Sequence, residues 1–223
     1  MKKASLIFSA AVMTAMLVTS FGWSTSSETA ESSEEITIGK QVWMTENLNV
    51  DTFRNGDPIP HARTNIEWER AMEKGEPAWC YYDNDPDNGE KYGKLYNWYA
   101  VNDPRGLAPE GWKIPSVEDW SRLRDFLGGD SVAGKKMKFT DFWADHRGES
   151  GNGTNESGFS GLPGGLRYGD GSFEDAGHVG FWWLSPSHPT DYPRYRILSK
   201  NTDGAHGGFG NKERGLSVRC LRD

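Results

Sequence analysis

Indole rings and carboxylates are the side chains best suited to chemistry in this chain, and the tandem tryptophans of GFWWLSPS, residues 180–187, stand out first. An indole can stack on the apolar face of a sugar ring. Neighbouring side chains in a strand point to opposite faces, so Trp182 and Trp183 cannot form one flat platform. The pattern therefore predicts either a central strand with both rings buried or one ring exposed at a binding surface.

A third tryptophan, Trp143, is the one that helical or strand periodicity explains least. It lies in the polar stretch TDFWADHRGESGNGTNESGFSG, residues 140–161, which is typical of loops used for binding. His178 lies close to the tandem pair in the sequence. We therefore predict that Trp143, Trp183 and His178 contact a ligand, either a glycan or a cell-surface partner.

Three alternating aspartates occur in YYDNDPDNG, residues 81–89. Asp83, Asp85 and Asp87 supply hard oxygen ligands at a spacing that can wrap calcium. The segment is not an EF-hand, because the sixth position is Asn88 instead of glycine and the twelfth is Lys94. The alternative is a turn in which Asp and Asn side chains hydrogen-bond to nearby backbone.

The usual catalytic motifs are absent from the sequence. The histidines form no HExxH or HxH pair, and neither a GxSxG nucleophile motif nor a phosphate-binding loop occurs. We predict no catalytic residues, and a binding protein in preference to an enzyme. The formal net charge of −7 also argues against nucleic acid and anionic membrane surfaces as partners.

The first 22 residues have the layout of a secretory signal peptide. Lys2 and Lys3 precede an apolar run, residues 4–18, which is short for a membrane span. Residues 23–35 are polar and acidic, which predicts a flexible tether before a folded domain at 36–223. No cysteine precedes Cys80, so we expect a secreted, periplasmic or cell-surface protein that is not a lipoprotein, with no transmembrane segment after cleavage.

The two cysteines, Cys80 and Cys220, are the whole thiol content of the chain. In an exported protein an even pair favours a disulfide. Two buried free thiols, or a copper or redox site, are the alternatives. The absence of CxxC excludes a thioredoxin-like role.

Hydrophobic periodicity predicts two helices, one over residues 65–74 and one after Ser116 that ends before the glycines at 128 and 129. A further turn or two is expected in residues 132–138. Short strands between glycine-rich turns are expected at residues 37–44, 79–82, 181–185, 195–199 and 216–221. This order of elements predicts an α+β fold.

Six segments occur in order along the chain: IGKQVWMTENLNV, YGKLYNWYAV, GLAPEGWKIPSVEDW, GFSGLPGGLR, FWWLSPS and GLSVRCLRD. Together they resemble the Fibrobacter succinogenes major paralogous domain family of exported bacterial proteins, over residues 36–223. GWKIPSVEDW is also similar to a stretch of the formylglycine-generating enzyme superfamily, and this resemblance implies a loop-rich, C-type lectin-like fold.

The resemblance brings no catalytic residues with it. The oxidoreductase branch of that superfamily binds copper through cysteines close in sequence, whereas Cys80 and Cys220 lie far apart. The leading hypothesis is an exported, non-enzymatic domain that binds a glycan or a surface protein. An enzyme of the formylglycine-generating type and a structural surface component are the alternatives.

Overall fold

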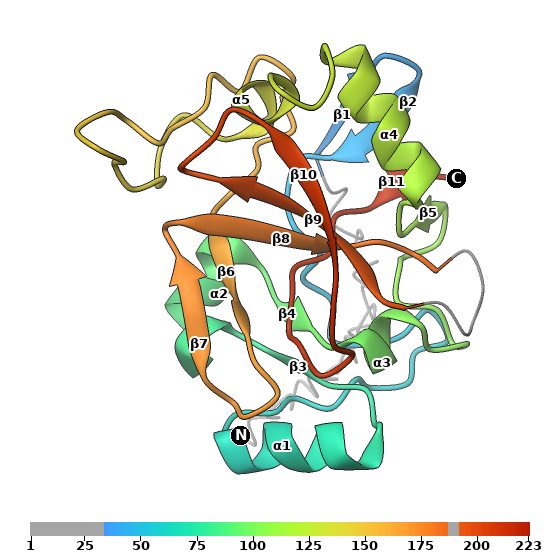
Figure 1. The fold of residues 1–223 in the computed structure, drawn as a ribbon. Coiled ribbons are helices and arrows are strands. Elements are labelled where there is room, and N and C mark those ends of the chain that lie inside the picture. Colours follow the sequence, from blue (N-terminus) through green and yellow to red (C-terminus); the bar gives the residue numbers. More distant parts are fainter. Residues whose placement is uncertain (1–33, 187–191) are drawn as a thin grey trace, which may run out of the picture. The chain divides into compact units, whose positions relative to one another are not determined.

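Three β-sheets and five α-helices make up the part of the chain that the computed structural model describes, residues 34–186 and 192–223 (Figure 1). The predicted α+β class is therefore confirmed. The predicted leader lies outside the described residues, as does the tether as far as residue 33. The last residue of the predicted tether, Glu35, begins the first strand, so the folded domain starts one residue earlier than predicted.

A four-stranded antiparallel sheet joins the two ends of the domain. Its order is β1 (Glu35–Ile38), β2 (Gln41–Met44), β11 (Leu221–Arg222) and β5 (Trp112–Lys113). β11 lies between β2 and β5, because Leu221 pairs with a residue of each. The strand β11 near the C-terminus thus completes a sheet that the first strands of the domain, β1 and β2, begin.

A five-stranded sheet forms most of the C-terminal half. Its order is β10 (Ala205–Phe209), β9 (Arg194–Ser199), β8 (Val179–Trp183), β6 (Gly164–Arg167) and β7 (Phe173–Ala176). All pairs are antiparallel except β6 with β8. β10 and β7 are therefore the edge strands, and β8 is central (Figure 1).

A two-stranded sheet, β3 (Trp79–Cys80) with β4 (Leu95–Tyr96), lies between the helices of the N-terminal half. Tyr96 also forms a bridge to Leu216, which ties this small sheet to the segment that leads into β11. The chain is thus held together by many short pairings, none longer than six residues.

Two helices of ten residues form where periodicity predicts them. The structure contains α1 (Asn65–Lys74) and α4 (Val117–Phe126), each opened by a capping box, from Thr64 and Ser116. The helix count of about two was too low, because three shorter helices accompany them, although the turn or two expected in residues 132–138 is confirmed as one of them. These are α2 (Pro86–Tyr92), α3 (Trp98–Val101) and α5 (Ala133–Met137), with a 3-10 turn at Tyr82–Asn84. Helices this short carry too few apolar positions for a 3.6-residue period to reveal.

All five predicted strands have somewhat different boundaries in the structure, and two of them differ in kind. Residues 37–44 form a hairpin, because Gly39 turns the chain with φ +64°. Residues 216–221 are strand only at their end, while Leu216 and Ser217 form isolated bridges. Local patterning could not reveal either, since both depend on which strands lie beside them. None of the helices in residues 34–186 and 192–223 is long and apolar enough to cross a membrane.

Candidate ligand-binding site

The tandem tryptophans are both buried. Trp182 is 1% exposed and Trp183 is 0% exposed, so the predicted role of Trp183 in ligand contact is wrong. The two rings do point to opposite faces of β8, because Trp183 packs in one core cluster and Trp182 in another. Each indole N–H is used inside the protein, by the carbonyl of Tyr96 and the amide oxygen of Asn47. The alternative of a central strand covered on both sides is confirmed.

Trp143 is also a core residue, at 3% exposed, and its predicted role as an exposed binding residue is wrong. Its indole N–H donates to the carbonyl of Gly161 at 3.2 Å. Its ring lies 5.4 Å from the ammonium of the buried Lys138. Trp143 therefore anchors the long loop to the domain.

His178 is exposed in the turn between β7 and β8. Its carbonyl accepts a hydrogen bond from the backbone N–H of Lys200, and its own N–H donates to Asp175. The structure does not place His178 in either of the pockets described below. It remains a prediction without support from a neighbouring functional group.

The three aspartates begin a helix and do not surround a metal. Asp85 is the N-cap of α2, and its carboxylate accepts from the backbone N–H of Asp87 at 3.0 Å. Asp83 is exposed and has a left-handed backbone, with φ 55°. Nowhere in the described residues do three or more His, Cys, Asp or Glu side chains gather to hold a metal ion. The alternative, a turn in which Asp and Asn side chains hydrogen-bond to nearby backbone, describes this segment. The calcium prediction is not supported.

Cys80 and Cys220 are free, buried thiols in the structure, which contradicts the predicted disulfide. They belong to different core clusters, Cys80 beneath α1 and Cys220 among the residues that surround Trp183. Burial raises the pKa of Cys80 to about 11 and that of Cys220 to about 12. Both thiols therefore stay protonated at neutral pH and behave as small apolar side chains.

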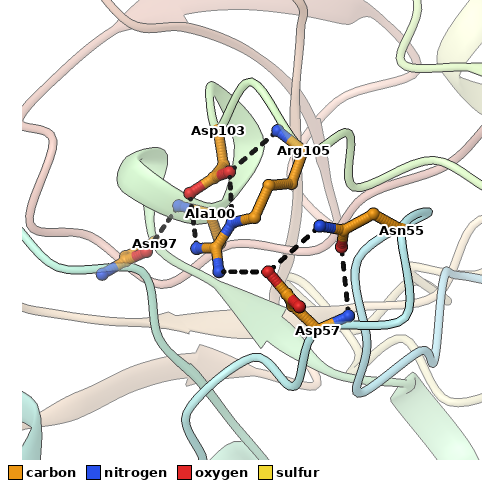
Figure 2. A network of polar contacts seen from close by, with 6 residues as sticks. All are labelled: Asn55, Asp57, Asn97, Ala100, Asp103 and Arg105. Atoms are coloured by element: carbon orange, nitrogen blue, oxygen red, sulfur yellow. Dashed lines mark hydrogen bonds and ion pairs between the residues drawn. The ribbon is translucent and has the colours of Figure 1, made fainter.

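A network of polar side chains on the loops around α3 has a structural role (Figure 2). Arg105 forms two hydrogen bonds with the carboxylate of Asp103, at 2.8 and 2.9 Å, and a third with Asp57. Asn55 in turn holds Asp57. The pKa values of both aspartates are lowered by these hydrogen bonds. Because these groups hydrogen-bond to one another, the network ties the loops together.

A pocket of about 480 Å³ is the better candidate, and we call it the Phe142 pocket. It lies between the segment after β2, the helix α2 and the loop 139–142. Its lining combines carboxylates, amides, one lysine and aromatic rings. The residues are Glu34, Thr45, Glu46, Asn47, Asn49, Gly89, Glu90, Lys91, Tyr92, Gly93, Phe139, Phe142, Ser160 and Leu162.

Phe142 is the exposed ring of this pocket, with 44% of its surface accessible. It stacks on Phe139 with the ring planes 10° apart, and the ammonium of Lys91 lies 3.9 Å from its centroid. Its backbone is left-handed, with φ 72°, a conformation that a bulky residue rarely adopts. Strained backbone of this kind clusters at ligand-binding sites. Sequence reasoning chose Trp143, and the residue beside it is the one exposed.

The floor of the Phe142 pocket is fixed by Asn47. Its amide oxygen accepts from Arg219 at 2.8 and 3.1 Å and from Trp182, and its amide nitrogen donates to the carbonyl of Tyr92. Arg219 is 1% exposed. The buried guanidinium therefore positions the pocket floor without reaching the ligand itself.

The rim of the pocket carries polar side chains that are available to a ligand. The side chains of Glu46, Asn49, Glu90 and Lys91 are exposed, and none of them forms a hydrogen bond or ion pair with another described residue. The Lys91 ammonium lies over the Phe142 ring, and the backbone carbonyl of Asn49 accepts from the Lys94 side chain. Carboxylates and amides can bind hydroxyl groups, and the Phe142 ring offers a flat apolar surface. This arrangement suits a ligand with hydroxyls on its edge and an apolar face.

Periodicity and motif searching both miss Phe142. The signal that could have found it is the local pattern around Trp143, because Phe142 precedes it and neighbouring side chains of an extended chain point to opposite faces. The sequence alone does not say which of the two faces the core.

The comparisons with known proteins agree with the resemblance. Residues 36–222 match the family model described as Fibrobacter succinogenes major domain. No curated protein and no solved structure shows significant similarity to the chain. Because the matched region covers nearly the whole described domain, the chain belongs to the Fibrobacter succinogenes major domain family.

Proposed function

We propose that this chain is an exported, non-enzymatic domain that binds a glycan in the Phe142 pocket. The observation that carries the proposal is the exposed, stacked ring of Phe142, held in a left-handed conformation beside polar side chains. Ligand pockets are typically lined by apolar and aromatic groups with a few well-placed polar ones. The leader-like first 22 residues support export.

The supporting physics is a match of two surfaces. A sugar ring has one face made of C–H groups and an edge made of hydroxyls. Phe142 and Phe139 offer a ring surface, while Glu46, Asn49 and Glu90 offer hydrogen-bond acceptors around it. The C-type lectin-like fold is part of this proposal, and it is supported by the short strands, the long loops and the family resemblance.

A second candidate is hydrolysis of the same glycan. Glu34, Glu46 and Glu90 line one pocket, and glycoside hydrolysis uses a pair of carboxyl groups on either side of the scissile bond. This candidate predicts release of reducing ends by the wild-type protein. Loss of that release in Glu46→Gln or Glu90→Gln, with binding retained, would replace binding by catalysis as the function.

The first prediction concerns Phe142. The Phe142→Ala variant should lose at least about tenfold in affinity for a glycan that the wild type binds, or about 1.4 kcal/mol. Binding is measured against cellulose, xylan and chitin and then by calorimetry with soluble fragments. The matched control is Phe126→Ala, which removes another exposed phenylalanine, 65% accessible, on α4 outside the pocket lining.

The outcomes separate clearly. Equal affinity of the Phe142→Ala and Phe126→Ala variants would remove the pocket from the proposal. Failure of the wild type to bind any polysaccharide would overturn the glycan proposal itself, and crosslinking on cells would then be used to find a protein partner.

A further inference from the structure

A second pocket, of about 790 Å³, lies on β9 and the edge strand β10 and has no role in the function proposed above. We call it the arginine pocket. In Figure 1, β10 is the outermost strand of the five-stranded sheet. The pocket is lined by Tyr192, Arg194, Arg196, Gly207, Gly208, Phe209, Gly210 and Asn211.

The strand register places its charged and aromatic side chains on one face. Arg194 pairs with Phe209 across the two strands, and Arg196 pairs with Gly207. Directly opposed residues in an antiparallel pair project to the same side of the sheet. Tyr195, between the two arginines, points the other way and is 7% exposed.

Gly207 makes room for one of the guanidinium groups. A Cβ atom at this position would come within 2.1 Å of Nη1 of Arg196, so the absence of a side chain at Gly207 leaves room for the Arg196 guanidinium in this position. The Nε atom of Arg196 is buried and has no hydrogen-bond partner. A buried guanidinium N–H without an acceptor is costly, and Arg196 also lines the pocket, where the rest of its guanidinium can bind an anion.

The charge on this face is locally positive in a chain of net charge −7. Neither Arg194 nor Arg196 forms an ion pair with another residue of the described ranges. Desolvation by burial is the main cause that lowers the pKa of Arg196, and Arg124 and Arg194 lower it further by their charge. An incoming carboxylate would reduce this repulsion.

Two large aromatic rings flank the arginines and are almost free of contacts. Tyr192 is 80% exposed and Phe209 is 77% exposed. We propose that the arginine pocket binds a carboxylate-bearing polysaccharide, with Arg194 and Arg196 on the carboxylates and Phe209 and Tyr192 stacked on the sugar rings. A uronic acid residue carries both features, a flat apolar face and a carboxylate, within one unit.

An acidic peptide is the other polyanion that arginines recognise. A peptide that added a strand would use the free backbone edge of β10. The arginine pocket instead includes Arg194 and Arg196 of β9, an inner strand, and so lies on the side-chain face of the sheet. Guanidinium forks and exposed rings on a sheet face suit a ligand recognised through its carboxylates and ring faces.

The test compares polygalacturonate with its fully methyl-esterified form, which has the same backbone without the charge. The purified protein should bind the first by calorimetry and lose at least tenfold in affinity for the second. The Arg194→Gln/Arg196→Gln variant should lose at least tenfold for polygalacturonate, and so should Phe209→Ala. The matched control Arg70→Gln removes an exposed arginine on α1 and should stay within twofold.

The design keeps the two proposals distinct and falsifiable. Arg194 and Phe209 are exposed, so Arg194→Gln and Phe209→Ala test the pocket even where a change at Arg196 disturbs folding. Phe126→Ala, which removes an exposed ring outside the lining of both pockets, should leave polygalacturonate binding unchanged. Wild-type affinity in the double arginine variant would overturn the proposal. Poly-glutamate binding that is equally tight and is not weakened by Phe209→Ala would assign the pocket to an acidic peptide, and this result would also overturn the proposal.

Discussion

Four cations, Lys94, Lys138, Arg167 and Arg219, are buried in the described domain. They take no carboxylate partner there and donate instead to neutral oxygens. Lys138 donates to the carbonyls of Gly151, Ser199 and Thr202, and Arg219 to those of Met44, Thr45 and Phe159. Most of these carbonyls belong to loop residues, such as Gly151, Thr202 and Thr45, which these cations supply with donors.

Arg219 shows the physical cost of this arrangement. Desolvation by burial lowers the pKa of its guanidinium to about 9. The group is still charged at neutral pH, and its hydrogen bonds connect loops that are far apart in the sequence. In a domain with many loops, such side chains do the work that regular backbone pairing does elsewhere.

The two thiols carry a prediction at the scale of single residues. An ordinary cysteine ionises near pH 9, whereas the buried Cys80 and Cys220 hold their protons to about 11 and about 12. The unfolded chain therefore releases these protons first, and the free energy of unfolding should fall as pH rises from 9 towards 12. The full loss is roughly 3 kcal/mol for Cys80 and roughly 4 kcal/mol for Cys220.

Chemical denaturation at pH 7 to 11 measures this loss. The Cys80→Ala/Cys220→Ala variant should have a shallower alkaline decline than the wild type, whatever its stability at pH 7. Equal slopes would contradict the raised pKa values. Thiol titration of the denatured wild type should find two reactive groups, and finding none would show a disulfide.

The helices α1 and α4 illustrate what local sequence can decide. Ser116 accepts from the backbone N–H of Asp119 at 3.1 Å, and the Asp119 carboxylate accepts from the N–H of Ser116 at 3.1 Å. Thr64 and Glu67 repeat the same exchange at α1. These bonds join residues three apart, so they are encoded in a short stretch of sequence.

At the scale of elements we predict the effect of removing one cap. Ser116→Ala should lower the free energy of unfolding by about 1 kcal/mol, because the first turn of α4 loses its acceptor. The helix holds Trp120 in the core, so the loss should appear in global denaturation. Ser131→Ala, an exposed serine outside any helix, is the control and should change stability by less than about 0.5 kcal/mol.

The domain as a whole depends on the closing strand β11. Leu221 is 3% exposed and pairs with Trp43 of β2 and Lys113 of β5. Deleting Leu221–Asp223 removes the strand that joins these two, and we expect it to lower the free energy of unfolding by several kcal/mol. Deleting Asp223 alone removes one backbone hydrogen bond, to Gly111, and should cost about 1 kcal/mol.

Thermal and chemical denaturation of the two truncations test this expectation. The closing role of β11 is supported if deleting Asp223 alone leaves the stability close to that of the wild type and deleting Leu221–Asp223 causes a large loss. A longer truncation as stable as the wild type would show that β2 and β5 need no strand between them.

Local patterns gave the α+β class, both ten-residue helices and the opposite orientation of Trp182 and Trp183. Each of these depends on residues within a few positions of one another, through helical period, capping or strand alternation. The family resemblance likewise rested on short stretches of sequence, the six segments that occur in order along the chain. Residues 37–44 were predicted as one strand and form a hairpin turned at Gly39. The predicted boundaries of the closing strand were wrong because its partners β2 and β5 come from distant parts of the chain.

The sequence by itself determined the family, the class of fold and the two capped ten-residue helices, while the structure decided between the two alternatives for the tandem tryptophans. Only the tertiary structure decided that Cys80 and Cys220 are free, that Asp85 caps a helix, and that Phe142 instead of Trp143 faces solvent. It also decided that Arg194, Arg196 and Phe209 share one face of a sheet. The physical reason is that burial and side-chain proximity depend on which distant segments pack together, and periodicity within a segment carries no information about that.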